Sequence, residues 1–338
     1  MRILIIGGCG FIGANAFFYL KSKKHKISIV DNFSGNSSKK NFIKIKQYYP
    51  KTKIYKIDIK NYKKISDIIK KLKPTSIILV AGQIAVTKSI SNPRQDFNST
   101  MLGTFNILES VRNFSKNTNI IYCSSNKVYG NLKNINIKET KISYRAKNKK
   151  NLIDETFNLD FVSPYGCSKG SSDQYVRDYT RTYKLKTVVL RLSCVYGPNQ
   201  WGTQDQGWIS WFIKKSINSE RINIFGNGKQ VRDILYIDDL TRLFEICIKK
   251  INKINGEIYN IGGGNRNKIS LLELIVKIEK ITMNKTNLKY SKERMGDQKF
   301  FVNNLSKIKK AVNWQPKVNI NKGINLFYTW IVNNLKNI

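Results

Sequence analysis

Tyr165 and Lys169 lie four residues apart, and the serine pair Ser124-Ser125 lies about forty residues upstream of them. In a helix, residues with this spacing share one face, so the phenol and the ammonium are expected to lie together. A free tyrosine titrates at about pH 10, but an adjacent ammonium favours the phenolate and makes it a better base. A serine hydroxyl beside them can stabilise an alkoxide as its charge develops. These residue types suit removal of a hydroxyl proton from a carbon that also loses a hydride.

An acceptor for that hydride is predicted at the start of the chain. The strand-like run RILII (2–6) leads directly into Gly7, Gly10 and Gly13, with the spacing G-x-x-G-x-x-G. The first glycine permits a tight turn, the second lets a pyrophosphate approach the backbone, and the third lets the following helix pack closely. The helix then begins at Phe11 and Ile12, where free N–H groups favour an anion. This pattern predicts a dinucleotide site.

The second strand-like run ends at Asp31, eighteen residues after Gly13. A carboxylate there accepts both ribose hydroxyls of an adenosine and repels a 2′-phosphate, which predicts NAD rather than NADP. Asn32 follows it directly. Asp58 and Ile59 follow the third run, and Ala81, Gly82 and Gln83 follow the fourth. Because the carboxyl ends of parallel strands share one edge, we expect these residues beside the cofactor.

Short apolar runs alternate with longer helical patterns over the first half of the chain, which predicts an α/β, Rossmann-type doubly wound parallel sheet. The strands are predicted at 2–6, 27–31, 53–57, 76–80, 119–123 and 187–192, and the helices near 11–23, 61–72, 94–114 and 165–183. We expect an NAD-binding domain over 1–192, rejoined by 235–261, and a smaller C-terminal substrate lobe over 193–338. The polar stretch 131–160 is predicted to be a long surface loop.

Composition narrows the function classes. The chain has 338 residues, 60 Lys+Arg against 22 Asp+Glu, one histidine and five cysteines without a C-x-x-C. This content disfavours histidine triads, metal sites and a disulfide framework, and it fits a cytoplasmic protein. The net charge of +38 leaves open a nucleic-acid-binding protein on a Rossmann scaffold. However, the lysines form many short groups rather than one stripe, so nucleic acid is the less favoured partner.

The amino terminus carries a second ambiguity. Its apolar run with Ala14-Asn15-Ala16 imitates a secretory signal, but the glycines that break the run make better sense as a nucleotide loop. No stretch is long and apolar enough to predict a membrane span.

The motifs together resemble the extended short-chain dehydrogenase/reductase superfamily, whose members modify nucleotide sugars. The likeness spans the chain and rests on the glycine loop, the serine pair before VYG, Y-x-x-x-K, RDILYIDDL (232–240) and the terminal W-x-P. The strings AGQIAVTKSI (81–90), SSNKVYG (124–130), SPYGCSKGSSDQY (163–175), DQGWISWF (205–212) and GNGKQVRD (226–233) are similar to the CDP-paratose 2-epimerases, also called CDP-tyvelose epimerases.

This resemblance implies NAD as cofactor, with Val195 beside it, and epimerisation at C2 of a CDP-3,6-dideoxyhexose of the kind used in O-antigen lipopolysaccharide. It also implies a homodimer through helices near 94–114 and 165–183. Tyr165 then acts as the base, Lys169 holds the nicotinamide ribose, and Ser125 aligns with the family's hydroxyl residue, with Ser124 as the alternative. Arginines suit a diphosphate, so Arg232 and Arg294 are predicted to bind it. The further substrate contacts are predicted at Gln83, Asn126, Lys127, Gln206, Trp208, Gly228 and Gln230.

The residues after the serine pair decide between reactions of this superfamily. Dehydratases need an acid and a base there, whereas this chain has Asn126 and Lys127, which serve neither role well. Epimerisation without elimination, or net reduction, therefore remains; the resemblance favours epimerisation at C2, with UDP-sugar 4-epimerisation as the alternative. Thr100, Val162 and Cys194 depart from the residues common in relatives, which leaves the sugar open.

Overall fold

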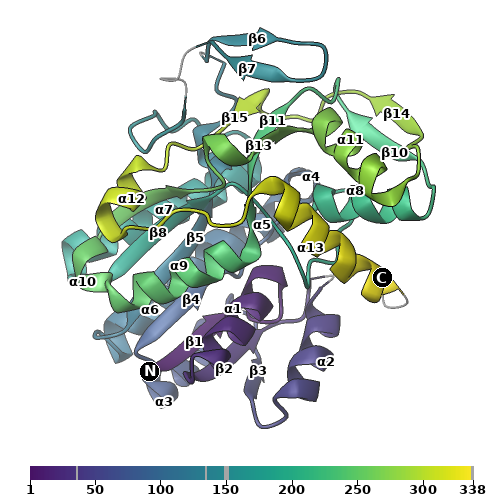
Figure 1. The fold of residues 1–338 in the computed structure, drawn as a ribbon. Coiled ribbons are helices and arrows are strands. Elements are labelled where there is room, and N and C mark those ends of the chain that lie inside the picture. Colours follow the sequence, from purple (N-terminus) through teal and green to yellow (C-terminus); the bar gives the residue numbers. More distant parts are fainter. Residues whose placement is uncertain (36, 134, 148–151, 336–338) are drawn as a thin grey trace.

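The computed structural model describes residues 1–35, 37–133, 135–147 and 152–335, and a parallel sheet forms its centre (Figure 1). The strands follow one another across this seven-stranded sheet in the order β12-β8-β5-β4-β1-β2-β3. They are β1 (Arg2–Ile6), β2 (Lys26–Asp31), β3 (Lys53–Lys56), β4 (Ser76–Leu79), β5 (Asn119–Ser125), β8 (Thr187–Leu192) and β12 (Glu257–Ile261). All neighbouring strands pair in parallel. The predicted α/β, doubly wound class is therefore confirmed.

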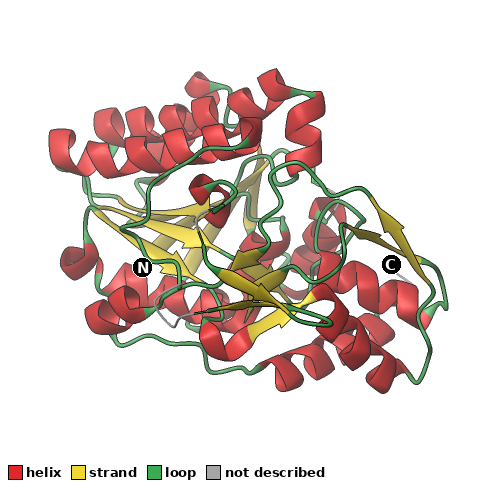
Figure 2. Ribbon diagram, turned by 90° about the horizontal axis from the view of Figure 1, so that it is seen from above, coloured by secondary structure: helices red, strands yellow, loops and turns green. Residues whose placement is uncertain are grey.

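Helices cover both faces of this sheet (Figure 2). One face packs against α1 (Phe11–Ser22), α2 (Ser38–Tyr48) and α9 (Ile237–Lys249), and the other against α3 (Tyr62–Leu72), α6 (Gly103–Phe114) and α7 (Ser163–Tyr183). Successive residues of a strand point to opposite faces, so Ile3 and Ile5 enter one core and Leu4 and Ile6 the other. This two-sided burial explains why the strands read as continuous apolar runs.

Two segments differ from the helices expected. The helix predicted near 94–114 is divided into α5 (Pro93–Phe97), a π-helical turn at Asn98–Leu102 and α6. No helix was expected over α2, which is rich in lysine and buries only Ser38, Asn41 and Ile45. Three buried positions are too few to produce a helical pattern in the sequence.

The expectation of a long surface loop over 131–160 was wrong for much of its length. The segment contains a hairpin of β6 (Ile137–Glu139) and β7 (Tyr144–Ala146). Tyr144 packs against Val231, Phe300 and Val302, and Ile153 is fully buried. These contacts come from distant parts of the chain, so local periodicity did not reveal them. Residues 134 and 148–151 lie outside the described residues.

The C-terminal lobe is built around a small mixed sheet. It contains β9 (Cys194–Tyr196), β11 (Val231–Tyr236), β13 (Lys268–Ser270) and β15 (Phe300–Phe301), while β10 (Ile222–Phe225) pairs with β14 (Leu288–Ser291). Its helices are α8 (Trp208–Ile217), α11 (Leu271–Thr282) and α13 (Ile320–Asn333). α12 (Ser306–Val312) instead packs beside β12 of the large sheet, and the short helices α4 (Val86–Ser91) and α10 (Ile251–Ile254) also lie outside the lobe. Side chains such as Phe212 and Phe327 belong to the same core as Phe17 of α1. A continuous apolar core therefore joins the lobe to the large sheet.

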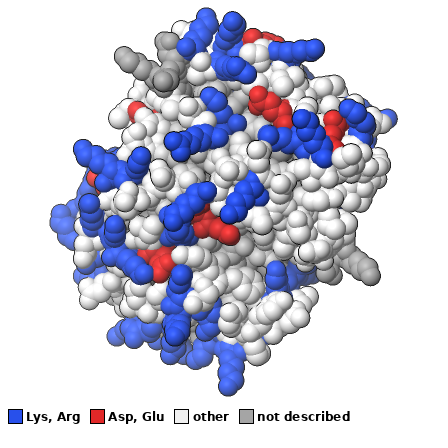
Figure 3. All heavy atoms as spheres, in the orientation of Figure 1, with Lys and Arg blue, Asp and Glu red and all other residues white. Residues whose placement is uncertain are grey.

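Charge is spread over the visible surface of the molecule. Figure 3 shows lysine and arginine side chains in many separate groups across this face, with a few carboxylates among them. Several surface cations pair with carboxylates, as Lys229 does with Glu139 at 2.6 Å. Among the described residues, no helix has both the length and the apolar character needed to cross a membrane.

A buried ion pair fixes α7 on the sheet. Arg191 of β8 donates from Nε to Oδ2 of Asp173 on α7 at 2.6 Å and from a terminal nitrogen to Oδ1 at 3.1 Å. Arg191 also donates to the Tyr129 hydroxyl, and the Ser124 hydroxyl donates to Asp173 at 3.1 Å. Both charged side chains are almost fully buried. The pair therefore sets the position of α7 relative to the carboxyl end of β5.

Replacing Asp173 by alanine is expected to lower the free energy of unfolding by about 3–5 kcal/mol, because it leaves the Arg191 guanidinium buried without a counter-ion. Urea denaturation of the two proteins measures this difference. The exposed Asp178 on the same helix is the matched control, and its replacement by alanine is expected to change stability by less than about 0.5 kcal/mol. Equal effects of the two substitutions would contradict a structural role for the pair.

Candidate active site

A cavity of about 600 Å³ lies where the carboxyl edge of the large sheet meets the C-terminal lobe. Its walls come from the start of α1, the end of β5, α7, the segment around β9, β11 and the segment before β15. Of the predicted residues, Phe11, Ile12, Ser124, Ser125, Asn126, Lys127, Tyr165, Lys169, Val195, Gln206, Trp208, Gln230, Arg232 and Arg294 line it. The fold thus brings together side chains from both halves of the chain.

The glycine loop has the close packing that a dinucleotide site requires. Gly7 has a φ of +85°, and a Cβ on Gly13 would lie 2.2 Å from the Gly7 carbonyl oxygen. α1 begins after Gly10 with no side chain capping its first turn. The N–H groups of that turn therefore face the cavity end of the loop without a side chain over them, which suits a pyrophosphate. Gly7, Gly10 and Gly13 fit the predicted cofactor.

Asp31 is positioned at the end of β2 by this same loop. Its carboxylate accepts the N–H of Cys9 at 2.9 Å and that of Phe33 at 2.8 Å. Burial raises the pKa of Asp31, while these N–H groups favour its charged form. The carboxylate is held in a fixed orientation at the sheet edge, as a ribose-binding acid requires.

The other predicted cofactor residues lie along the same edge without lining the cavity. Asn32 donates to Asp58 at 3.1 Å, and Ile59 packs where a side chain on Gly103 would otherwise lie. Ala81 and Gly82 follow β4, and a Cβ on Gly82 would lie 3.1 Å from the Thr100 hydroxyl. Their closeness to one another agrees with the topology, since β1, β2, β3 and β4 end at one edge.

Tyr165 and Lys169 occupy one face of α7, as their spacing predicted. Lys169 is buried, and its Nζ donates to the Cys123 carbonyl oxygen at 3.0 Å. Burial lowers the pKa of Lys169 to about 8. We expected the ammonium to lower the pKa of Tyr165; instead, burial is the largest influence and raises that pKa, while the Ser125 hydroxyl lowers it. The protein alone therefore favours a neutral phenol.

The two serines of the pair have different surroundings. The Ser124 hydroxyl donates to Asp173 and belongs to the ion pair that seats α7. The Ser125 hydroxyl donates to the Asn126 side-chain oxygen at 3.4 Å, accepts the N–H of Lys127 at 3.2 Å, and lowers the pKa of Tyr165. This difference supports Ser125, rather than Ser124, as the hydroxyl that faces the chemistry.

Sequence reasoning missed Asp96 on α5, which packs against α7. Asp96 is fully buried, and neither of its carboxylate oxygens has a hydrogen-bond partner of good geometry. Burial raises its pKa, while Ser168 and the Lys169 ammonium favour its charged form. An acidic residue in a short helical turn carries no distinctive sequence signal, so only the packing of α5 on α7 reveals it.

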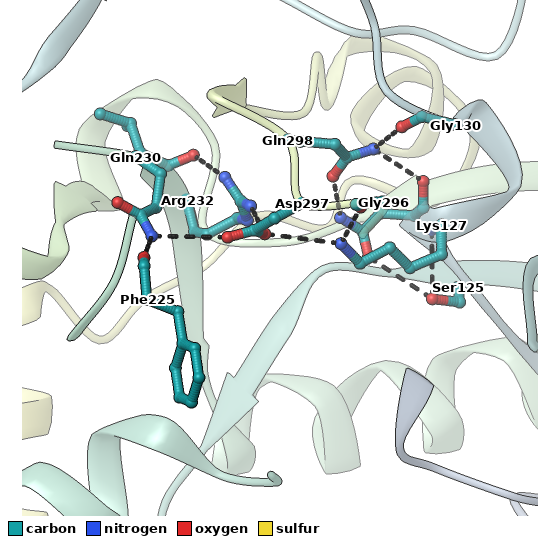
Figure 4. A network of polar contacts seen from close by, with 11 residues as sticks. Ser125, Lys127, Gly130, Phe225, Gln230, Arg232, Gly296, Asp297 and Gln298 are labelled. Carbon is teal, nitrogen blue, oxygen red and sulfur yellow. Dashed lines mark hydrogen bonds and ion pairs between the residues drawn. The ribbon is translucent and has the colours of Figure 1, made fainter. Parts of the chain in front are cut away.

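At the other end of the cavity, Asp297 lies between two cations (Figure 4). It accepts a hydrogen bond from Arg232, lies 3.7 Å from the Lys127 Nζ, and accepts an N–H of Gln230 at 3.4 Å. Burial opposes its ionisation, but Arg232 and Lys127 together hold the pKa of Asp297 below its usual value. Sequence reasoning missed this carboxylate, although it lies only three residues after Arg294.

Gln298 ties the same segment to the end of β5. The Asn126 amide donates to Gln298 Oε1 at 3.0 Å, and Gln298 Nε2 donates to the Gly130 carbonyl at 2.7 Å. Lys127 Nζ donates to the Gly296 carbonyl at 2.9 Å. Figure 4 shows these contacts beside one another. Asn126 and Lys127 therefore join the end of β5 to the C-terminal lobe.

Three predicted substrate residues have other neighbours. Gly228 does not line the cavity; it forms a turn with a φ of +74° and packs on Leu272. Gln83 does not line it either, because its side-chain oxygen accepts the N–H of Ile84. Arg294 lines the cavity, but its guanidinium stacks 3.8 Å from the Phe225 ring centre and pairs with Asp205 at 3.2 Å.

Replacing Gly13 by alanine is expected to weaken NAD binding at least about tenfold, because the added Cβ would meet the Gly7 carbonyl at 2.2 Å and displace the loop. Calorimetric titration of the purified protein with NAD measures the affinity. Gly10→Ala meets the same carbonyl at 3.3 Å, so its effect is expected to be smaller. The reverse order of the two losses would argue against this loop as the dinucleotide site.

Comparison with known proteins agrees with this geometry. The family model described as GDP-mannose 4,6 dehydratase matches residues 4–327. CDP-paratose 2-epimerase of Salmonella typhi is 41% identical, with 98% of this chain and 99% of the relative covered. A putative UDP-glucose 4-epimerase of Methanocaldococcus jannaschii is 30% identical over 98% of this chain and 99% of its own length.

Solved structures superpose over nearly the whole chain. UDP-glucose 4-epimerase of Thermotoga maritima, solved with UDP-glucose, has a TM-score of 0.84 at 27% identity and covers 99% of this chain and 100% of its own. UDP-glucuronic acid 4-epimerase of Bacillus cereus, solved with UDP-glucuronic acid and NAD, has a TM-score of 0.84 at 25% identity, covering 98% and 99%. The chain belongs to the GDP-mannose 4,6-dehydratase family of extended short-chain dehydrogenases/reductases, as its motifs predicted.

Proposed function

We propose that this protein is an NAD-dependent epimerase that converts CDP-paratose to CDP-tyvelose by inverting C2 of the sugar. Membership of a family of nucleotide-sugar enzymes supports the enzyme class and the cofactor. The 41% identity with a CDP-paratose 2-epimerase over nearly the whole length of both chains supports the substrate. The proposed reaction type rests on one observation, the charged groups that line the cavity.

That set lacks the pair of groups that an elimination needs. The carboxylates that line the cavity are Asp205 and Asp297, and both pair with arginines. Asn126 and Lys127 follow the serine pair, and their side chains are engaged by Gln298, Gly296 and Asp297. A dehydratase needs a free acid and base at the sugar carbons that lose water. The cavity therefore supports oxidation and re-reduction, although the family takes its name from a dehydratase.

The chain's own residues perform the proton transfer and the positioning. NAD, when bound, accepts the C2 hydride, returns it, and brings a positive charge that favours the Tyr165 phenolate. Tyr165 takes the proton of the C2 hydroxyl, and Ser125 donates a hydrogen bond to the same oxygen. Lys169 is the residue expected to hold the nicotinamide ribose, and its charge favours the phenolate. The resulting 2-keto sugar turns within the cavity before the hydride returns to its other face, and Tyr165 gives back the proton.

The proposal includes a homodimer and a cytoplasmic location. Exposed aromatic side chains lie on the helical layer expected at a homodimer interface, among them Phe97 beside α6 and Tyr175 and Tyr183 of α7. Such a row is unusual on a surface that stays in water. The five cysteines are free thiols, which supports a cytoplasmic location.

Incubation of the NAD-loaded protein with CDP-paratose tests the reaction, with CDP-tyvelose expected by NMR. In D₂O, C2 of the product is expected to carry hydrogen rather than deuterium, because the hydride leaves and returns without exchange with solvent.

Tyr165→Phe is expected to lower kcat by at least about a hundredfold, since it removes the proton acceptor. Ser125→Ala is expected to lower kcat more than Ser124→Ala, whose main effect falls on stability.

UDP-galactose in the same assay tests the second candidate, a UDP-sugar 4-epimerase, which the 30% identity with a putative enzyme of that kind supports. Turnover of UDP-galactose without turnover of CDP-paratose would replace the proposed reaction with this one. Full activity of Tyr165→Phe would remove the proposed base in either case.

The pH dependence of kcat/KM reports on Lys169. Because burial lowers the pKa of Lys169 to about 8, activity is expected to fall above that pH as the ammonium loses its proton. The Asp96 carboxylate raises the pKa of Lys169, so Asp96→Asn is expected to move this alkaline limb to lower pH. Kinetics between about pH 6 and pH 10 measure the limb. A uniform loss of rate without movement of the limb would assign Asp96 a structural role only.

A further inference from the structure

Lys127 presents a partly buried positive charge to the cavity. Its side chain is 21% exposed, and burial lowers its pKa. Nζ donates to the Gly296 carbonyl at 2.9 Å and lies 3.7 Å from Asp297. The more direct partner of Asp297 is Arg232, whose side chain is 7% exposed. The Lys127 ammonium therefore has a neutral carbonyl as its hydrogen-bond partner, and it shares the carboxylate of Asp297 with Arg232.

The charges at this end of the cavity do not balance. Lys127 and Arg232 are two cations that share the single carboxylate of Asp297. Arg294 has its own partner in Asp205, and burial keeps the nearby Cys194 thiol neutral by raising its pKa. The nearby Asp233 carboxylate accepts hydrogen bonds from Ser193, Gly264 and Asn303. Among the described residues that line this end of the cavity, one positive charge is left in excess. A cation that is partly withdrawn from water without full compensation is unfavourable, so this place is suited to an anion that contacts both cations.

The excess charge is anchored beside the hydroxyl that faces Tyr165. The backbone N–H of Lys127 donates to Ser125 Oγ at 3.2 Å, and Figure 4 shows this contact together with the ion pairs of Asp297. Gln298 holds the intervening Asn126 from the other lobe. Lys127 and Ser125 therefore lie in one short segment, and the contact between Asn126 and Gln298 fixes that segment against the C-terminal lobe.

We propose that Lys127 binds the phosphate attached directly to the sugar, and that it thereby selects C2 as the carbon that reacts. The proposal rests on the C2 reaction above. C2 is bonded to the carbon that carries the diphosphate, whereas C4 lies across the ring. When C2 lies at Ser125 and Tyr165, the sugar-linked phosphate is close enough for a cation anchored to Ser125. Asp297 is the counter-ion of Lys127 and Arg232 until the phosphate takes that role.

Affinities of the NAD-loaded protein for CDP and CMP test the contact, because the second phosphate of CDP stands for the sugar-linked phosphate. In calorimetric titrations, Lys127→Met is expected to weaken CDP binding about tenfold and CMP binding less than about twofold. Lys127→Arg is expected to keep the preference for CDP. Lys116→Met removes the same charge from an exposed position before β5, and both affinities are expected to stay unchanged.

An equal loss for CDP and CMP would overturn the proposal, because it would mean that Lys127 only supports the segment at 294–298. Unchanged affinities would overturn it as well. If Lys127→Met does not fold, Asp297→Asn gives the same test: freeing both cations is expected to raise the ratio of CDP to CMP affinity, and an unchanged ratio overturns the phosphate contact. The epimerase proposal fails separately, if wild-type protein with normal CDP preference makes no CDP-tyvelose.

Discussion

A parallel sheet places the carboxyl ends of all its strands on one edge, and the cofactor end and the serine–tyrosine–lysine part of the candidate site depend on this constraint. The turns after β1, β2 and β4 supply the cofactor end, and the turn after β5 supplies the serine pair. α7 brings Tyr165 and Lys169 to the same edge because Asp173 on its buried face is clamped by Arg191 of β8. Residues far apart in sequence thus meet because of strand direction and one buried ion pair.

Burial changes the pKa values of the lysines that line the candidate site. Lys169 and Lys127 are both withdrawn from water, and in each case burial lowers the pKa of the ammonium. Each has a carboxylate within electrostatic reach, Asp96 for Lys169 and Asp297 for Lys127. A site with few, well-placed charges in a low dielectric is sensitive to each of them. The proposed reaction type rests on this arrangement, because the cavity carboxylates are engaged by arginines and Tyr165 is the proposed group for proton transfer.

The large positive charge of the chain has a modest part in this picture. Of 60 lysines and arginines, those that line the cavity are Lys127, Lys169, Arg232 and Arg294. The others include many groups on the surface, where they pair locally or face solvent (Figure 3). Their summed field attracts anionic nucleotides in general, but it does not distinguish one nucleotide sugar from another. We assign recognition to the cations that line the cavity, whose positions the fold sets.

The sequence by itself determined the sheet, the glycine loop and the Tyr165–Lys169 face, because these depend on local patterns: apolar runs, glycine spacing and helical period. It did not determine the hairpin of β6 and β7 or the burial of Ile153, since their partners lie at 231 and 300–303. It also kept Ser124 as the alternative to Ser125; the tertiary structure engages Ser124 with Asp173, which favours Ser125 as the proposed catalytic hydroxyl. The same holds for two acidic residues that are ordinary in the sequence: tertiary packing buries Asp96 and places the partly buried Asp297 beside Lys127. Charge interactions act through space, so a local pattern cannot specify them.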